Sequence, residues 1–142
     1  MTKKDCTEKE FPAKVEELDS VLAFLEEALE GSDASRKAVT SLVLALEEAF
    51  VNVANYAYEG IRDDGTVTIS VCVEDDTAIV TLRDAGMAFD PLALEDPDIT
   101  ASVQDRKIGG LGIYMIRQST DECSYRRVDG ENILTMKKKI RS

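Results

Sequence analysis

Between Leu42 and Gly60 the apolar residues follow the period of an α-helix. They recur every three or four positions and so share one face of the predicted helix. This face is the predicted core stripe, formed by Val39, Leu42, Val43, Leu46, Phe50, Val53 and Ala57. Three polar residues, Glu48, Asn52 and Asn55, follow at i, i+4 and i+7, which places them in a row on the opposite face.

That row of polar residues has unusual neighbours for a surface helix. The flanking positions hold Leu44, Ala45 and Val51, so the helix is apolar almost all round. A carboxylate and two amides are therefore carried into partly buried surroundings, where polar groups cost free energy unless they find partners. Two interpretations fit: a satisfied polar cluster in the core, or a carboxylate with neighbouring amide oxygens that holds a metal-bound ligand.

The rest of the chain predicts a leading helix, a closing helix and two β-hairpins. Apolar residues at helical spacing precede Gly31, a helix stop, and either Ser32 or Asp33 is predicted to cap the next helix. Alternation of apolar and polar residues predicts the strands, and Asp129-Gly130 suits the second hairpin turn. The predicted helices cover about 15–29, 33–58 and 109–119, and the predicted strands cover 66–73, 77–83, 123–128 and 133–139.

The order of these elements predicts the fold class. Helices and strands arrive in pairs without regular βαβ alternation, which is typical of an α+β fold. We expect one domain over residues 1–142, a two-layer sandwich whose mixed, mostly antiparallel sheet is covered on one face by about three helices. Residues 1–10 fit either a short edge strand or a disordered lead-in. The irregular segment 85–109, with a brief helical turn near 92–94, is predicted to be a lid over a ligand.

Charge and composition narrow the classes of partner. The chain has 142 residues, 44% of them hydrophobic, and a formal net charge of -11. This charge argues against nucleic acid and against anionic membrane surfaces as partners. A polyanionic ligand would have to be held by local cations, by Mg²⁺ or by helix N-termini.

The cysteine and histidine counts bear on chemistry and compartment. Cys6, Cys72 and Cys123 are an odd number without metal-ligand spacing, so free thiols in a reducing cytosol are expected. The sequence holds no histidine, which excludes Ser-His and Cys-His nucleophilic sites and His-ligated zinc. We find neither a signal-peptide pattern nor an apolar run near membrane-spanning length, and therefore predict a cytoplasmic protein.

Two short motifs suggest a nucleotide site when they are taken together with the polar helix row. Asp84-Ala85-Gly86 follows a predicted strand, and Gly109-Gly110-Leu111-Gly112 opens a predicted helix. Glycines let backbone N–H groups approach phosphate oxygens, and a helix N-terminus favours an anion. Each motif alone is a weak signal, and neither a P-loop nor a dinucleotide-binding fingerprint is present.

In order and spacing, these elements resemble the three boxes of the GHKL (Bergerat-fold) ATPase superfamily. The N-box corresponds to residues 48–52, the G1 box to 84–91 and the G2 box to 109–114. The resemblance extends over about residues 11–139 and is greatest to the anti-sigma-factor serine/threonine protein kinases. It implies the GHKL fold, binding of ATP with Mg²⁺, and a mobile lid between the second and third boxes.

The resemblance also implies a role for individual residues. Glu48 matches the general base, Asn52 the amide that ligates Mg²⁺, and Asp84 the carboxylate that accepts a hydrogen bond from the adenine amino group. Arg106 and Lys107 are the best-placed local cations for phosphate, or else two solvated lid charges. The implied ligand-binding set is Asn52, Asn55, Asp84, Gly86, Ala88, Arg106, Lys107, Gly109, Gly110, Leu111 and Gly112.

The chain departs from the family pattern in three places. Ala88 stands where the G1 box usually has its second glycine. The threonine that often supports the adenine-binding aspartate has only Asn132 and Thr135 as imperfect counterparts. Ile108 occupies the place near the G2 glycines where the kinases have an arginine, so phosphotransfer is less firmly implied than ATP binding.

Three functions follow as hypotheses. The first is a serine/threonine protein kinase whose homodimer sequesters a sigma factor and phosphorylates a small antagonist protein. The second is a non-catalytic, ATP-gated binding module in which nucleotide orders residues 85–109. The third, a detached catalytic domain of a histidine kinase, is weaker because the chain has no helix with a phosphoacceptor histidine.

Overall fold

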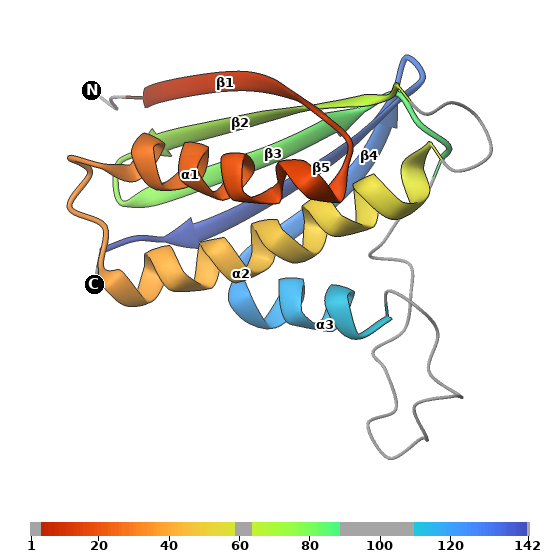
Figure 1. The fold of residues 1–142 in the computed structure, drawn as a ribbon. Coiled ribbons are helices and arrows are strands. Elements are labelled where there is room, and N and C mark those ends of the chain that lie inside the picture. Colours follow the sequence, from red (N-terminus) through yellow and green to blue (C-terminus); the bar gives the residue numbers. More distant parts are fainter. Residues whose placement is uncertain (1–3, 59–63, 89–109, 142) are drawn as a thin grey trace.

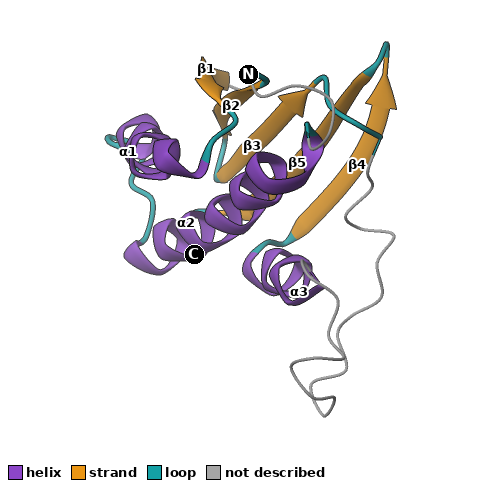
Figure 2. Ribbon diagram, turned by 45° about the vertical axis from the view of Figure 1, so that its right-hand side comes forward, coloured by secondary structure: helices purple, strands orange, loops and turns teal. Residues whose placement is uncertain are grey.

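The computed structural model describes residues 4–58, 64–88 and 110–141. Its elements are β1 (Lys4–Pro12), the 3₁₀ turn η1 (Val15–Glu17), α1 (Leu18–Leu29), α2 (Arg36–Asn52), the π-helical turn η2 (Val53–Ala57), β2 (Thr66–Glu74), β3 (Thr77–Asp84), α3 (Gly110–Ser119), β4 (Glu122–Val128) and β5 (Glu131–Lys139). The strands form one sheet in the order β1-β2-β3-β5-β4. The three α-helices lie on one face of this sheet (Figure 1, Figure 2).

The α+β prediction is confirmed, with one correction. Every neighbouring strand pair in the described sheet is antiparallel, so the sheet is not mixed. The β2–β3 and β4–β5 pairs are hairpins, which are antiparallel by their connection, and β1 and β5 each add to an edge of the first hairpin in the antiparallel sense. For the described part of residues 1–10, the edge strand is confirmed, since β1 begins at Lys4.

Alternation in the sequence explains which face of each central strand meets the helices. In β2 the side chains of Val67, Ile69 and Val71 are buried, while their polar neighbours are only partly so. β3 follows the same pattern, and the register sets Val71 opposite Val80. Because successive side chains point to opposite faces of a sheet, one apolar face packs beneath the helices.

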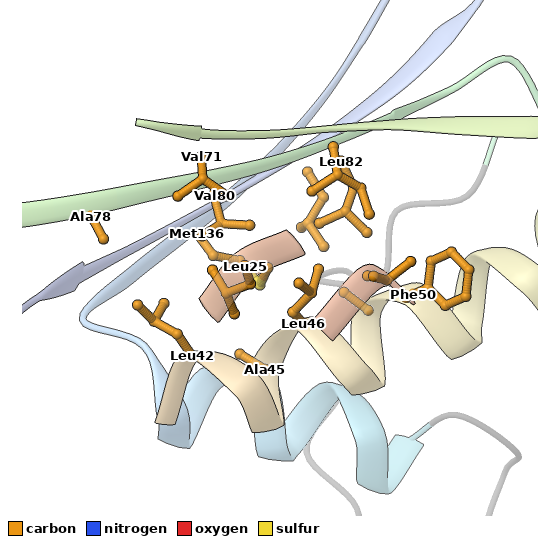
Figure 3. Close-up of a cluster of buried hydrophobic side chains, with 14 of the residues drawn as sticks. Leu25, Leu42, Ala45, Leu46, Phe50, Val71, Ala78, Val80, Leu82 and Met136 are labelled. Atoms are coloured by element: carbon orange, nitrogen blue, oxygen red, sulfur yellow. The ribbon is translucent and has the colours of Figure 1, made fainter. Parts of the chain in front are cut away.

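Helix α2 supplies the middle of the core, although its buried face differs from the prediction. Figure 3 shows side chains of α1, α2 and the sheet meeting in one cluster, among them Leu25, Leu46 and Leu82. The buried residues of α2 are Ala38, Leu42, Ala45, Leu46, Ala49 and Phe50. Val39, Val43 and Val53 are only partly buried. On a helix that is apolar almost all round, the wheel alone could not select the arc that faces the sheet.

The start of α2 also differs from the prediction. The N-cap is Ser35, whose Oγ accepts a hydrogen bond from the Ala38 N–H at 3.1 Å, and not Ser32 or Asp33. Asp33 has a φ of 61° and belongs to the turn that follows Gly31. The Ser35 N–H donates to the Ile140 carbonyl at 2.8 Å, so a contact with the end of the chain selects the cap.

The predicted free thiols at Cys6 and Cys72 are wrong, because these residues form a disulfide. They lie directly opposite each other on β1 and β2, with Cα atoms 4.0 Å apart. The sequence did not reveal this pair, because the number of cysteines is odd and the two residues are 66 positions apart. Only the pairing of β1 with β2 brings them together. Cys123 is free. The cytoplasmic location drawn partly from free thiols stays a prediction.

We expect reduction of this disulfide to lower the free energy of unfolding by about 2–4 kcal/mol, because a cross-link over a long loop restricts the unfolded chain. Denaturant unfolding with and without a thiol reductant measures the difference. A Cys6→Ser variant serves as the control and should show no response to reductant. Equal stability of the oxidised and reduced protein would contradict the expectation.

One helical stretch of the described chain, Arg36–Ala57, is long and apolar enough by length and composition to cross a membrane. The prediction concerned an apolar run, and Glu47 and Glu48 interrupt the apolar residues of this helix, so the helix does not contradict it. The central helix of a protein core has the same character, and Leu42 and Phe50 of this helix are fully buried in the core. The feature is weak evidence for a membrane.

The predicted lid, residues 85–109, lies mostly outside the described residues. Only residues 85–88 are described, and the helical turn expected near 92–94 is not among them.

Candidate active site

A pocket forms where the end of α2 meets β3, α3 and the β4–β5 hairpin. Its walls are mostly apolar and carry a few polar side chains, as is common in small-molecule sites. It is lined by Ala49, Asn52, Val53, Ala57, Leu82, Asp84, Ile116, Tyr125, Asn132 and Leu134. Two residues predicted separately, Asn52 from the N-box and Asp84 from the G1 box, therefore lie in one pocket.

Asn52 brings an unsatisfied polar group to this pocket. Its Nδ2 is buried and has no hydrogen-bond partner among the described residues. Leaving a buried donor unpaired costs about 1–3 kcal/mol, so such groups ask for an explanation. A ligand that carries oxygen atoms would supply the missing acceptor, and the amide Oδ1 could at the same time ligate a hard cation.

Glu48 lies one helical turn before Asn52 and is partly buried. Burial raises the pKa of its carboxyl group above the ordinary value, and the negative charge of neighbouring Glu47 adds to this. A raised carboxyl pKa suits a general base, because a more basic carboxylate accepts a proton more readily. Glu48 is not among the residues that line the pocket, so it lies beside the pocket and not within it.

Asn55 does not share the environment of Glu48 and Asn52. It is exposed and does not line the pocket, contrary to the predicted buried row. The cause is the π-helical turn Val53–Ala57, in which hydrogen bonds run from i to i+5. This wider turn advances each residue by a smaller angle, so a position seven residues after Glu48 no longer falls on the same face. A ligand-binding role for Asn55 stays a prediction.

Asp84 is anchored within the pocket by two donors. Its side chain is 5% exposed, and its Oδ1 accepts hydrogen bonds from the Gly86 N–H at 2.9 Å and from Asn132 Nδ2 at 3.0 Å. Both described donors meet the same oxygen, so neither of them uses Oδ2. A carboxylate accepts several hydrogen bonds, so Oδ2 is suited to a donor from a ligand.

The partner of Asp84, Asn132, is one of the two imperfect threonine counterparts, and it lies directly opposite Asp84 in the β3–β5 pair. Its Oδ1 accepts hydrogen bonds from Tyr125 Oη at 2.5 Å and from Arg127 Nη1 at 3.1 Å. Sequence reasoning missed Tyr125 and Arg127. Tyr125 and Arg127 are two positions apart in β4, with Arg126 between them, so both lie on the same face of the sheet as Asn132. This alternation is the sequence signal that could have identified them.

Gly86 is required by close packing against the end of the helix. A Cβ there would lie 2.6 Å from the Ala57 carbonyl carbon and would also meet the Ala57 carbonyl oxygen. The next residue, Met87, donates its N–H to the Ala57 carbonyl at 2.7 Å. Gly86 therefore allows the chain to pass close to the backbone of η2, which lines the pocket. A close approach of Gly86 to a bound base stays a prediction.

We expect Gly86→Ala to lower the free energy of unfolding by about 1–3 kcal/mol, because the added methyl group meets backbone that cannot easily move. Thermal or denaturant unfolding measures the loss. Gly31→Asn is the control, since Gly31 has open space around it and a φ of 78°, which asparagine tolerates. If both variants were equally stable, the close packing at Gly86 would be excluded.

Tyr58 joins the helix end to the two strands beneath it. Its buried hydroxyl donates to the Thr66 carbonyl at 2.6 Å and accepts from the Ala85 N–H at 3.0 Å. A Cβ at Gly65 would overlap the Tyr58 ring, so a glycine is needed there. These contacts position the turn after β3, and with it Asp84 and Gly86.

The remaining predicted site residues fall into three groups. Gly110, Leu111 and Gly112 form the first turn of α3, as the glycine cluster predicted. Ala88 is exposed and ends the second described range. Arg106, Lys107 and Gly109 lie outside the described residues. No group of three or more His, Cys, Asp or Glu residues that could hold a metal ion occurs among the described residues.

Residues 11–138 match the histidine kinase-like ATPase domain. The chain belongs to this family. The match spans all three boxes and confirms the resemblance drawn from them.

Several proteins with similar sequences are named as protein kinases. The serine-protein kinase RsbW of Bacillus pumilus (strain SAFR-032) is 27% identical over 138 residues, covering 94% of this chain and 85% of that protein. The serine-protein kinase RsbW of Listeria monocytogenes serotype 4a (strain HCC23) is 26% identical over 107 residues, covering 72% and 68%. The serine/threonine-protein kinase BtrW of Bordetella bronchiseptica is 30% identical over 98 residues, covering 68% and 67%.

A solved structure has a similar fold. The crystal structure of the RsbU and RsbW domains of Rv1364c from Mycobacterium tuberculosis superposes with a TM-score of 0.69 at 16% identity. The match covers 97% of this chain and 33% of that one, so this chain spans about a third of the larger protein. At this identity the likeness is one of fold.

Proposed function

We propose that this histidine kinase-like ATPase is an ATP- and Mg²⁺-dependent serine/threonine protein kinase. The observation that carries the proposal is the shared pocket of Asn52 and Asp84, in which a buried amide lacks a partner and a carboxylate is held by two donors. Relatives named serine-protein kinase support the reaction class.

In this proposal Asp84 selects the base. A carboxylate oxygen accepts a hydrogen bond from the exocyclic amino group of adenine, whereas the carbonyl oxygen of guanine at the same position would face it as a second acceptor. The apolar walls of the pocket, including Val53, Ile116 and Leu134, would cover the faces of the ring.

Asn52 is the residue that would hold Mg²⁺. Mg²⁺ takes oxygen ligands and is commonly bound by one or two protein groups together with substrate phosphates and water. The side chain fits this role, because Oδ1 is a suitable ligand and the buried Nδ2 still lacks an acceptor among the described residues. When bound, Mg²⁺ supplies charge neutralisation on the phosphates, as in other phosphoryl transfers.

Glu48 is proposed as the general base. One helical turn before Asn52, it would accept the proton of the attacking serine or threonine hydroxyl, and its raised pKa makes it more basic than an exposed glutamate. The backbone N–H groups at the start of α3, in Gly110–Gly112, would bind the phosphates at a helix N-terminus.

The partners come from the family resemblance. We propose that the protein sequesters a sigma factor as a homodimer, phosphorylates a small antagonist of that complex and acts in the cytoplasm. Arg106 and Lys107 are proposed to contact phosphate.

The test is incubation of the purified protein with γ-labelled ATP, Mg²⁺ and the candidate antagonist protein, followed by detection of label on serine or threonine. Label on the antagonist supports the kinase. Binding of ATP without transfer to any candidate would instead favour the nucleotide-gated binding module, and absence of ATP binding would overturn both.

A further inference from the structure

A ladder of polar side chains crosses three neighbouring strands, and two of its members, Asp84 and Asn132, line the pocket. The register sets Asp84 of β3 opposite Asn132 of β5, and Asn132 opposite Arg127 of β4. Asn132 is 6% exposed and lies between the two charged side chains. It contacts Asp84 through Nδ2 and Arg127 through Oδ1.

The hydrogen-bonding capacity of the Asn132 amide is fully used. An asparagine side chain has two N–H donors and an oxygen with two lone pairs. The donors reach Asp84 Oδ1 at 3.0 Å and the Met87 carbonyl at 2.8 Å. The oxygen accepts from Tyr125 Oη at 2.5 Å and from Arg127 Nη1 at 3.1 Å. Asn132 therefore has no group left for the ligand and acts through Asp84.

Only one orientation of this amide satisfies its surroundings. A guanidinium only donates, so Arg127 requires the oxygen of Asn132 on its side. The Met87 carbonyl only accepts, so it requires the nitrogen on the other side. In the reversed orientation Oδ1 would face the Asp84 carboxylate, setting acceptor against acceptor. Arg127 also donates from the same Nη1 to the Gly86 carbonyl at 3.0 Å, which ties the G1 backbone to β4.

We propose that Tyr125 and Arg127 are positioning residues that hold Asn132 as a donor to Asp84 and thereby set the preference of the site for 6-amino purine nucleotides. With Oδ1 of Asp84 occupied by Asn132 and by the Gly86 N–H, Oδ2 receives the 6-amino group. The inference rests on the proposed role of Asp84 in binding adenine, and it assigns the selectivity to two residues outside the family boxes.

The test compares the affinity of the purified protein for ATP and for purine riboside triphosphate, which has the same ring and phosphates without the 6-amino group. Tyr125→Phe and Arg127→Met should each lower the affinity for ATP by about threefold, and the double variant should lower it by about tenfold. This is the range expected for the loss of one or two hydrogen bonds. Affinity for purine riboside triphosphate should stay within about twofold, because that ligand makes no use of Oδ2.

Arg126→Met is the matched control, since Arg126 is the neighbouring arginine of β4, points to the opposite sheet face and makes no hydrogen bond or ion pair with any residue that the structure describes. It should change neither affinity. Thermal unfolding of each variant establishes that it is folded, and Tyr125→Phe, which removes a single oxygen atom, keeps the test valid if the arginine variant unfolds.

If Tyr125 and Arg127 had a merely structural role, their variants would lower the affinity for both nucleotides together. That result would overturn the inference, as would an unchanged affinity for ATP in the double variant. Asp84→Asn separates this inference from the proposed function. If Asp84→Asn removes the preference for ATP and the Tyr125 and Arg127 variants do not, only the positioning role fails. If Asp84→Asn leaves the preference intact, the adenine-binding role fails as well.

Discussion

Glu48→Gln is expected to lower phosphotransfer by about 10²–10⁴-fold, the usual contribution of a general base, while ATP still binds. Glutamine has nearly the same shape as glutamate and cannot accept the hydroxyl proton. The assay is transfer from γ-labelled ATP to the antagonist protein, with ATP affinity measured separately by calorimetry. Loss of transfer with retained affinity assigns Glu48 to the chemical step.

Glu47→Gln is the matched control, because it removes the neighbouring carboxylate from the same helix. Glu47 raises the pKa of Glu48 through its charge, so this variant should lower that pKa and leave most of the transfer rate. Equal losses in the two variants would argue against a specific base at position 48, and full activity of Glu48→Gln would exclude it.

Glu48→Gln has a second expected effect, on stability. Burial raises the pKa of Glu48 above 4.5, so the folded protein binds this proton more tightly than the unfolded chain does. The carboxylate therefore destabilises the fold increasingly as the pH rises from the unfolded-state pKa to the folded-state pKa, and the full effect is present above the folded-state pKa. Glu48→Gln should unfold at a higher temperature than the parent at neutral pH, and this difference should disappear as the pH falls below 4.5.

Asp84→Asn is expected to lower the affinity for ATP by about 10–100-fold, which corresponds to the loss of one hydrogen bond to a charged group in a desolvated site. The asparagine oxygen can still accept from the Gly86 N–H and from Asn132, so the fold should be kept. An amide nitrogen placed at Oδ2 would instead face the adenine amino group donor to donor. Calorimetric titration with ATP measures the effect.

Asp129→Asn provides the control for Asp84→Asn, since Asp129 is exposed in the β4–β5 turn with a φ of 52°, which asparagine adopts readily. It should bind ATP as the parent does, and both variants should unfold near the parent temperature. Unchanged ATP affinity in Asp84→Asn would mean that adenine binds elsewhere.

The proposed kinase and the nucleotide-gated module share the pocket of Asn52 and Asp84 and differ at Glu48. A module that only binds nucleotide does not need a partly buried carboxylate, with its cost in stability, one turn from a metal ligand. The partial burial and raised pKa of Glu48 therefore favour chemistry. The transfer assay, with its two glutamine variants, decides between these functions.

The sequence alone was sufficient for the features that depend on neighbouring residues. Alternation located β2 and β3, and Asp129-Gly130 marked a turn in which both residues have positive φ. These patterns report local backbone geometry and one-sided burial, so they can be recognised within a short window. The order and spacing of the three boxes identified the family, which the match over residues 11–138 shows.

Only the tertiary structure decided the contacts between distant segments. The pairing of Asp84 with Asn132 spans 48 residues, and the disulfide of Cys6 with Cys72 spans 66. Both depend on strand order and register, which are set by the burial of the whole sheet and not by any local pattern. The environment of Asn55 was likewise decided by the tertiary structure. The helical wheel assumed 3.6 residues per turn, but Asn55 lies in a π-helical turn and therefore on a different face.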